Sequence, residues 1–145
     1  MKIMLFLFIA SSINSMNIEN PIKGDDTEAI IQAVELFSDS ADKRNVKAME
    51  TIMHADFRAI VNRVFGSAEV SIMDKSLYLD LLKQGKLGGE EREVTIESIH
   101  LEGHNALVKA TLEGKELRFI TFMQLVKATS GEWKVISDMP NIEKK

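Results

Sequence analysis

The sequence predicts an α+β domain in which helices cover one face of a curved antiparallel sheet. Residues 92–139 contain four β-rich runs separated by short turns with glycine or polar residues, which is the pattern of an antiparallel meander. The residues before them repeat apolar side chains at helical intervals. Helices that precede the strands in this way pack together on one side of a sheet. We therefore expect the sheet to curve around the longest helix and enclose a cavity, as a cone does.

Length and charge limit the classes of protein that fit. The 145 residues predict one domain, large enough to bury a core. The net charge is −4, and the basic residues are dispersed without interleaved aromatic residues, so no nucleic-acid partner is expected. The chain has no cysteine, which excludes disulfides, thiol catalysis and thiolate metal sites.

The first residues are typical of a secretory signal peptide. Lys2 precedes the apolar run Ile3–Ala10, and small residues follow in Ser11–Ser15; this run is too short to cross a bilayer. We expect residues 1–15 to be removed and residues 16–24 to form a linker. The mature protein is then expected to be soluble, exported to the periplasm or secreted, free of the membrane and not a lipoprotein. An amphipathic or core N-terminal helix is the alternative.

Three helices are expected upstream of the meander. The first covers residues 25–43, and its apolar face consists of Ile30, Val34, Phe37 and Ala41. The second is short, residues 46–53, and Asn45 can cap it. Asp74 can cap the third helix, which Gly85 ends.

The segments between these helices are expected to be extended. His54–Phe57 ends the second helix and leads into a strand, Arg58–Val64. Gly66–Ile72 adds a little more strand. After the third helix, Lys86–Glu91 contains two glycines and is expected to be a flexible loop before the sheet.

The meander supplies the remaining strands. They are expected at Arg92–Leu101, Ala106–Leu112, Glu116–Lys127 and Trp133–Met139. Pro140 should stop the last strand, because proline cannot donate a ladder hydrogen bond. The domain is therefore expected to span residues 25–140, with residues 141–145 as a C-terminal tail.

Several short motifs carry a resemblance to a known superfamily. They are Ala33-Val34-Glu35-Leu36-Phe37 in the first helix, His54-Ala55-Asp56-Phe57 after the second, Tyr78-Leu79-Asp80-Leu81-Leu82 in the third, and Phe119–Val126 and Gly131–Ile136 in the last strands. In this order the chain resembles the NTF2-like superfamily, the cone-shaped fold of nuclear transport factor 2, ketosteroid isomerase and SnoaL-like cyclases. Within it the chain is most similar to the putative lumazine-binding or DUF4440-type branch of exported bacterial proteins. The resemblance implies three helices on a curved antiparallel sheet, but members differ in activity, so it does not fix a function.

Three residues are candidates for acid–base chemistry. His54 and Asp56 lie two apart after the second helix and could form an acid–base pair at a cavity mouth; a helix-terminal histidine beside a solvated aspartate is the alternative. For Asp138, the resemblance implies carboxylates that project into the cone and act as bases or hydrogen-bond donors. Strand alternation, however, places Asp138 on the face opposite Trp133. If Trp133 points into the cone, Asp138 then points out of it.

Six residues are candidates for a ligand site. Four are expected as apolar walls of the cavity, with plain core as the alternative: Tyr78, Phe119, Met123 and Trp133. Arg58 and Asn62 share one face of the first strand and could present donors to an anionic or heterocyclic ligand. The pattern leaves open whether that face points inward or to solvent.

A metal or cofactor site is not expected. His100 and His104 bracket the Glu102-Gly103 turn and could form a cross-turn metal pair, but polar residues suit an exposed hairpin turn in any case. The sequence contains no HExxH motif and no phosphate-binding glycine loop.

Small-molecule binding without catalysis fits these features best. We expect a small apolar or heterocyclic ligand in the cone cavity, since the fold encloses space but no convincing catalytic set is present. One alternative is an isomerase, dehydratase or cyclase-type enzyme that uses a cavity carboxylate or histidine. Another is a dimeric interaction module whose cone is filled by side chains. An open cone with a buried carboxylate would favour the enzyme.

The strand around residue 122 predicts a second apolar surface. Its outer face consists of Arg118, Ile120, Phe122, Gln124 and Val126. A strand that is buried on one side normally carries polar residues on the other, yet Ile120, Phe122 and Val126 are apolar. We therefore expect a homodimer through the outer face of the sheet. The alternative is that the N-terminal arm or the Lys86–Glu91 loop folds over this face.

Overall fold

A computed structural model describes residues 24–145. The predicted signal peptide, residues 1–15, and the predicted linker up to residue 23 lie outside the described residues. The described chain forms these elements in order: α1 (Gly24–Asp42), α2 (Val46–Ile52), β1 (Met53–Asn62), the short 3-10 turn η1 (Val64–Gly66), β2 (Val70–Asp74), α3 (Lys75–Lys83), β3 (Glu93–Glu102), β4 (Asn105–Glu113), β5 (Leu117–Lys127) and β6 (Trp133–Lys144).

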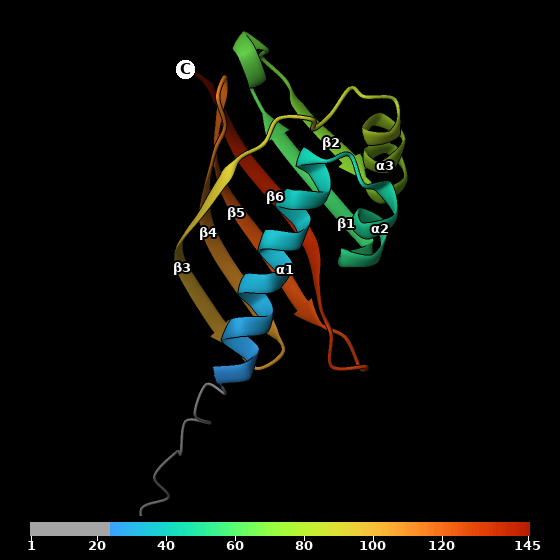
Figure 1. Cartoon of the computed structure of the whole chain (residues 1–145), viewed down its shortest axis with the longest axis vertical. Coiled ribbons are helices and arrows are strands. Elements are labelled where there is room, and N and C mark those ends of the chain that lie inside the picture. The colour runs from blue at the N-terminus through green and yellow to red at the C-terminus, as the bar shows by residue number, and fades with distance from the viewer. Residues whose placement is uncertain (1–23) are drawn as a thin grey trace, which may run out of the picture.

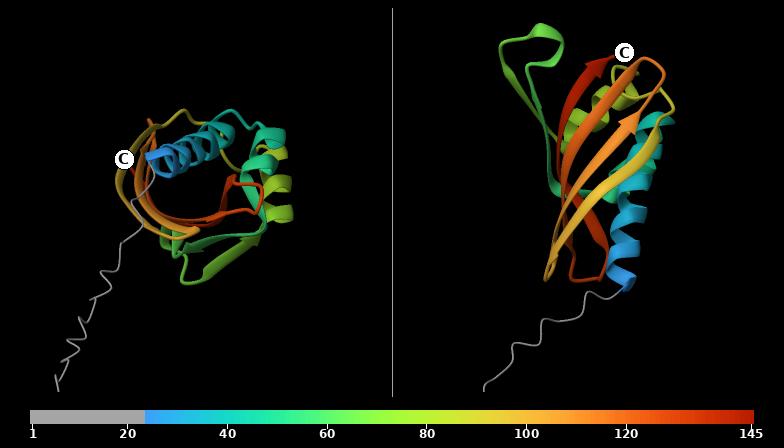
Figure 2. Two further views of the ribbon diagram at one scale, coloured as in Figure 1. Left: turned by 90° about the horizontal axis from the view of Figure 1, so that it is seen from below. Right: turned by 90° about the vertical axis from the view of Figure 1, so that its left-hand side faces the viewer.

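The strands make one curved sheet that wraps around α1 (Figures 1 and 2). Their order is β2-β1-β6-β5-β4-β3. All neighbours are antiparallel except β1 and β6, which are parallel. Seen from below in Figure 2, α1 lies on the concave side and α2 and α3 lie beside β1, so none of the three described helices covers the convex side. The predicted α+β cone with three helices and a four-strand meander is therefore confirmed.

The helices form where their signals predict. Ile30, Val34, Phe37 and Ala41 of α1 are all buried against the sheet. The Asn45 side chain accepts the amide of Ala48, and the Asp74 side chain accepts the amide of Leu77. Both side chains thus satisfy amides that a helix start leaves unpaired.

The second helix ends at Ile52, one residue before the expected end, but the expectation that residues 54–57 end the helix before a strand at Arg58 is wrong. Residues 54–57 belong to β1, which begins at Met53, where the backbone turns extended (φ −79°, ψ 135°). Lysine side chains donate hydrogen bonds to the last carbonyl groups of α2. The Lys75 ammonium donates to the Glu50 oxygen at 2.8 Å, and the Lys134 ammonium donates to the Thr51 oxygen at 2.6 Å. The helix therefore ends without a further turn.

The expected tail at residues 141–145 is also wrong, because β6 continues through Pro140 to Lys144. The whole of β5 lies opposite it, with Leu117 paired to Lys144. On its other side, β1 is paired with β6 only as far as Asp138. A proline two residues later interrupts no pairing with β1, which is why the strand tolerates it.

A β-bulge in β6 reverses the alternation that the sequence predicts. Gln124 pairs with Ser137, but the next residue, Leu125, pairs with Val135, so Ile136 is an extra residue on β6. An inserted residue shifts every later side chain to the other face. As a result Trp133, Val135 and Asp138 are all buried. The prediction that Asp138 points away from the face of Trp133 is wrong for this reason.

The segment between α3 and β3, residues 84–92, crosses the top of the cone and is called the strap below. The Arg44 guanidinium donates to three of its carbonyls, those of Gly85, Leu87 and Gly88, at 3.0–3.1 Å. The Gly89 amide donates to the Ala41 oxygen at 3.1 Å. The strap therefore packs against the end of α1. It does not fold over the convex face, which was one alternative for that surface.

Candidate functional site

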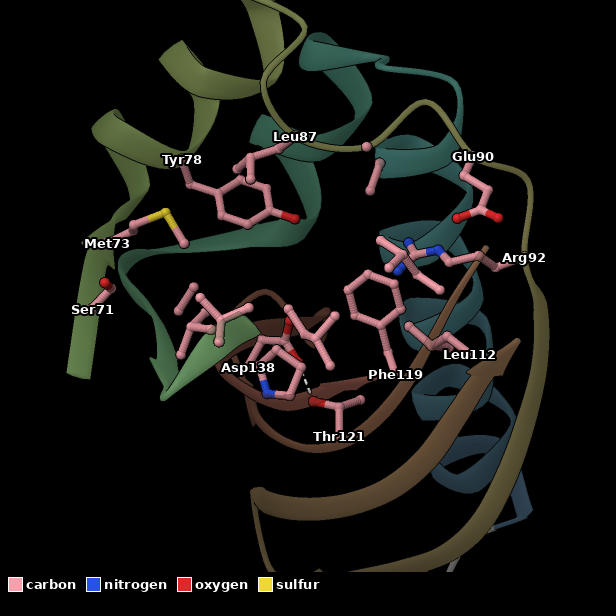
Figure 3. Close-up of a pocket in the computed structure, with 18 of the residues that line it drawn as sticks. Ser71, Met73, Tyr78, Leu87, Glu90, Arg92, Leu112, Phe119, Thr121 and Asp138 are labelled. Carbon is pink, nitrogen blue, oxygen red and sulfur yellow. Dashed lines mark hydrogen bonds between the residues drawn. The ribbon is translucent and has the colours of Figure 1, made fainter. Parts of the chain in front are cut away.

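The cone encloses a cavity of about 430 Å³ beneath the strap. Its walls come from the inner faces of β1, β4, β5 and β6 and from α1, α3, β2, η1 and the strap (Figure 3). Apolar side chains form most of the lining, among them Phe37, Val61, Met73, Leu112 and Phe119. A cavity of this size and polarity suits a small organic molecule.

Asp138 places a carboxyl group in this apolar cavity. The residue is 9% exposed, and its Oδ1 accepts a hydrogen bond from the Thr121 hydroxyl on β5. Burial raises the pKa of the Asp138 carboxyl to about 6, although the Thr121 hydrogen bond and the charge of Arg92 both act to lower it. A carboxyl group in this range can exchange a proton near neutral pH.

Tyr78 of α3 faces the same space. Its ring packs edge-on to Phe57 at 5.6 Å and lies 6.1 Å from the ring of Phe37. The hydroxyl points into the cavity in Figure 3. Burial, and next the negative charge of Asp138, raises the pKa of the Tyr78 hydroxyl. The hydroxyl therefore stays protonated and can donate a hydrogen bond to a bound molecule.

Arg92, the last residue of the strap, forms the opposite wall. Its Nε lies 2.6 Å from Oδ1 of Asp42, and its backbone amide donates to Oδ2 of the same carboxylate at 2.9 Å. Both side chains are less than one-tenth exposed. The guanidinium lies 4.7 Å above the centre of the Phe119 ring. A buried pair held in this way fixes Arg92 and neutralises its charge.

Comparison with known proteins identifies the family. A family model described as "Putative lumazine-binding" matches residues 25–139. The chain belongs to this family. The predicted membership of the NTF2-like superfamily and of its lumazine-binding branch is thereby confirmed.

Solved structures agree on the fold of this family member. An NTF2-like protein of unknown function from Shewanella baltica has a TM-score of 0.73 at 16% identity, covering 87% of this chain and all of its own. One from Silicibacter pomeroyi reaches 0.71 at 15% identity, covering 82% and 97%. A ketosteroid isomerase-like protein from Erwinia carotovora atroseptica reaches 0.67 at 11% identity, with the same coverages. No curated protein matches the chain.

The structure brings three of the predicted site residues together. Tyr78, Phe119 and Asp138 all line the cavity of this family member. Met123 and Trp133 do not; they belong to the buried core, and the Trp133 indole donates to Asp26 at 3.1 Å. These two residues therefore follow the alternative of plain core packing.

The polar candidates on β1 lie outside the cavity. Arg58 and Asn62 are exposed on the convex side, while Ala59 and Val61 between them line the cavity. The face of β1 that points into the cavity is therefore the one opposite Arg58 and Asn62. The Arg58 guanidinium is bonded to the neighbouring Phe57 oxygen at 2.7 Å.

His54 and Asp56 are also away from the cavity lining. The Asp56 amide donates to Nδ1 of His54 at 3.0 Å, so this nitrogen acts as an acceptor, and the Asp56 side chain is 79% exposed. Because both residues belong to β1, the helix-terminal alternative for His54 is wrong as well. Their contact is a local one within the strand.

Sequence reasoning missed Thr121 and Arg92 as parts of the site. The sequence does contain a feature that points to Thr121. It is the only hydroxyl residue among the inward-facing positions of β5, and a buried hydroxyl needs a hydrogen-bond partner. Arg92 carried no signal in the sequence, since its partner Asp42 lies 50 positions away.

His100 and His104 are exposed near the β3–β4 turn, and within residues 24–145 no three metal-binding side chains lie close together. In that same range, no helix has the length and apolar character needed to cross a membrane.

Proposed function

We propose that the protein binds a small, mostly apolar or heterocyclic molecule in the cone cavity and does not transform it. The observation that carries this proposal is the 430 Å³ cavity, whose apolar walls surround a few polar groups. Ligand sites usually have this composition, because apolar walls supply affinity and the polar groups fix orientation. The family description, with its reference to lumazine, is consistent with a planar heterocycle. The cavity argues against the alternative of a cone filled by its own side chains.

A second candidate function is supported by Asp138. Its buried carboxyl faces apolar walls, and its pKa of about 6 suits a general base or acid. An isomerase, dehydratase or cyclase-type enzyme would use such a group to move a proton on a bound substrate. Binding alone is the simpler proposal, since within residues 24–145 Thr121 is the only group hydrogen-bonded to this carboxyl, and no second group there could relay a proton.

Native mass spectrometry of the purified protein tests the binding proposal. We expect a retained molecule, or a complex after titration with lumazine, flavins, steroids or fatty acids. Ala59→Phe should abolish the complex, because the new ring would occupy the cavity that Ala59 lines. Ala55→Phe is the matched control, since Ala55 is exposed on the same strand.

The outcomes separate the two candidates. If none of these molecules binds, or if Ala59→Phe binds them as well as the unchanged protein does, the cavity is not the binding site. Mass spectrometry also reports whether the bound molecule changes with time. Conversion that Asp138→Asn abolishes while binding persists would favour the enzyme over the binding protein.

We also propose that the protein is exported. The support is the sequence from Lys2 to Ser15, with its basic start, apolar run and small residues. Mass spectrometry of the protein from its native cell should find an N-terminus between Ile13 and Asn17. Intact Met1 on a cytoplasmic protein would contradict the proposal.

A further inference from the structure

We propose that the cavity selects a positively charged ligand, namely a weakly basic heteroaromatic amine whose protonated N–H group donates to Oδ2 of Asp138. This inference rests on the proposed function, because it names the class of molecule that the cavity would bind. Two features of the site carry it. They are the bonds that the polar lining groups already make and the charge that these groups leave unbalanced.

One oxygen of the Asp138 carboxyl group has no hydrogen-bond partner among residues 24–145. The Thr121 hydroxyl bonds to Oδ1, and Oδ2 receives no donor. Within the same residues, Oγ of Ser40 is the only fully buried side-chain oxygen or nitrogen without a partner. Oδ2 is therefore not sealed inside the protein but open to the cavity that Asp138 lines (Figure 3). A molecule in the cavity can supply its donor.

The two cations of the cavity lining are not paired with Asp138. Arg92 is held by Asp42 at 2.6 Å, and the Lys86 side chain lies on the exposed strap. The charge of Arg92 does reach Asp138 and acts to lower its pKa. Because Asp42 offsets that charge, Arg92 gives the Asp138 carboxylate only part of the compensation that a counterion would give.

The charged groups around the cavity leave one negative charge in excess. Two are positive, Lys86 and Arg92, and three are negative, Glu90, Asp138 and the Asp42 that holds Arg92. Every other lining residue is uncharged, and the Tyr78 hydroxyl stays protonated. The Glu90 carboxylate already accepts the backbone amide of Glu116 at 2.5 Å. The group that lacks a partner is therefore Asp138.

A protonated amine matches both deficits at once, because it brings a positive charge and an N–H donor. Burial raises the pKa of Asp138 to about 6, and a cation beside the carboxyl group would favour its ionised form. The apolar walls and the rings of Tyr78 and Phe119 favour an aromatic body for this cation. A ring nitrogen combines the two, since its charge is delocalised over an aromatic system.

Two probes of nearly the same shape test the inference by isothermal titration calorimetry at pH 7. The first is 2-aminoquinoline, which is protonated near neutral pH and then carries N–H donors. The second is quinolin-2-one, a neutral lactam that keeps the rings and an N–H group. The difference between them therefore reports on charge. We expect 2-aminoquinoline to bind about tenfold more tightly or better, as a charge-assisted hydrogen bond requires.

Asp138→Asn should remove this preference, because asparagine cannot carry a negative charge. We expect it to weaken the binding of 2-aminoquinoline by about 30-fold and that of the lactam by less than about threefold. Asp56→Asn is the matched control, since the Asp56 carboxyl is 79% exposed and lies outside the cavity lining. It should keep the preference of the unchanged protein.

A second measurement needs no variant. Carbon-13 NMR follows the Asp138 carboxyl of the unchanged protein with and without each probe. We expect 2-aminoquinoline to lower the pKa of Asp138 more than the lactam does. The affinity for 2-aminoquinoline should decline below about pH 6, where the carboxyl group takes up its proton, and again above the pKa of the ligand.

The outcomes separate this inference from the proposed function. Equal binding of the two probes, or tighter binding of the lactam, would overturn the inference and leave the binding function in place. A preference that persists in Asp138→Asn would also overturn it, because the charge would then be recognised elsewhere. If neither probe binds but lumazine, flavins, steroids or fatty acids do, the inference alone fails. If no molecule binds, the proposed function fails with it.

Discussion

Thr121 on β5 donates its hydroxyl proton to the carboxyl group of Asp138 on the neighbouring strand β6. Both residues are buried, and both line the cavity. This bond is the only one that the described chain provides to the Asp138 side chain. It leaves Oδ2 available to a molecule in the cavity.

Asp138→Asn should stabilise the protein at pH 8 but not at pH 4. The pKa of Asp138 is about 6 in the folded protein, against an ordinary value of 3.8. Between these values the folded state binds more protons than the unfolded state, so stability falls as the pH rises. At 1.36 kcal/mol per pKa unit, the loss is on the order of 3 kcal/mol and is complete above about pH 6. Asparagine avoids it, because it stays neutral.

Urea unfolding of both proteins at pH 4, 6 and 8 measures this difference. Other titrating groups cancel, because they are the same in the two proteins. A difference in unfolding free energy that does not change with pH would mean that Asp138 keeps its ordinary pKa.

Thr121→Val should raise the pKa of Asp138 further. The Thr121 hydroxyl stabilises the ionised carboxylate, and valine has the same shape without the donor. Carbon-13 NMR of the aspartate carboxyls across the pH range reports the change. Thr111→Val is the matched control, since the Thr111 hydroxyl donates to the exposed Glu97 at 2.7 Å. An equal change of the Asp138 pKa in both variants would contradict this prediction.

Arg92→Met should destabilise the fold by about 3–5 kcal/mol, the usual cost of leaving one buried partner of an ion pair unpaired. The Asp42 side chain that remains is only 8% exposed. The double variant Arg92→Met with Asp42→Asn should recover part of the loss, because no buried charge is left. Lys109→Met, which removes an exposed ion pair with Glu97, should cost less than about 1 kcal/mol.

Urea unfolding at constant pH compares these three variants. If the double variant is no more stable than Arg92→Met alone, the loss comes from packing against Phe119 and not from the unpaired carboxylate.

Arg44→Ala should loosen the strap without unfolding the domain. The three hydrogen bonds from the guanidinium to the strap are exposed, so their loss affects local opening more than global stability. Exchange of the Gly89 amide hydrogen should become about tenfold faster, which corresponds to about 1.4 kcal/mol. Lys43→Ala is the control, because Lys43 pairs with Asp39 on the surface of α1. Equal exchange of Gly89 in both variants would show that Arg44 does not hold the strap.

Local patterns in the sequence predict the elements of this fold well. The apolar spacing of α1 and the caps Asn45 and Asp74 depend on residues within a few positions of one another, and the structure confirms them. The meander is predicted for the same reason. What the patterns miss depends on partners far along the chain, such as β5 opposite residues 141–144 and Asp42 opposite Arg92.

The site was harder to predict than the fold because one residue decides it. The inserted Ile136 in β6 turns Asp138 from the convex side into the cavity. A bulge leaves no clear mark in the sequence, so strict alternation leads to the opposite face. The apolar character of Tyr78 and Phe119 predicts cavity walls, and both line the cavity, whereas the same argument is wrong for Met123 and Trp133, which belong to the core.

The attachment of the strap separates access to the cavity from the stability of the fold, two properties that usually change together. The walls of the cavity are also the core of the domain, so a substitution in Phe37 or Leu112 alters folding and fit at once. The strap covers the same space, and its residues 85–88 are held by exposed hydrogen bonds from Arg44, whereas Gly89 and Arg92 are fixed by separate bonds to α1. If a small molecule binds in the cavity as we propose, a substitution at residue 44 would change its residence time while leaving the thermal tolerance of the protein the same.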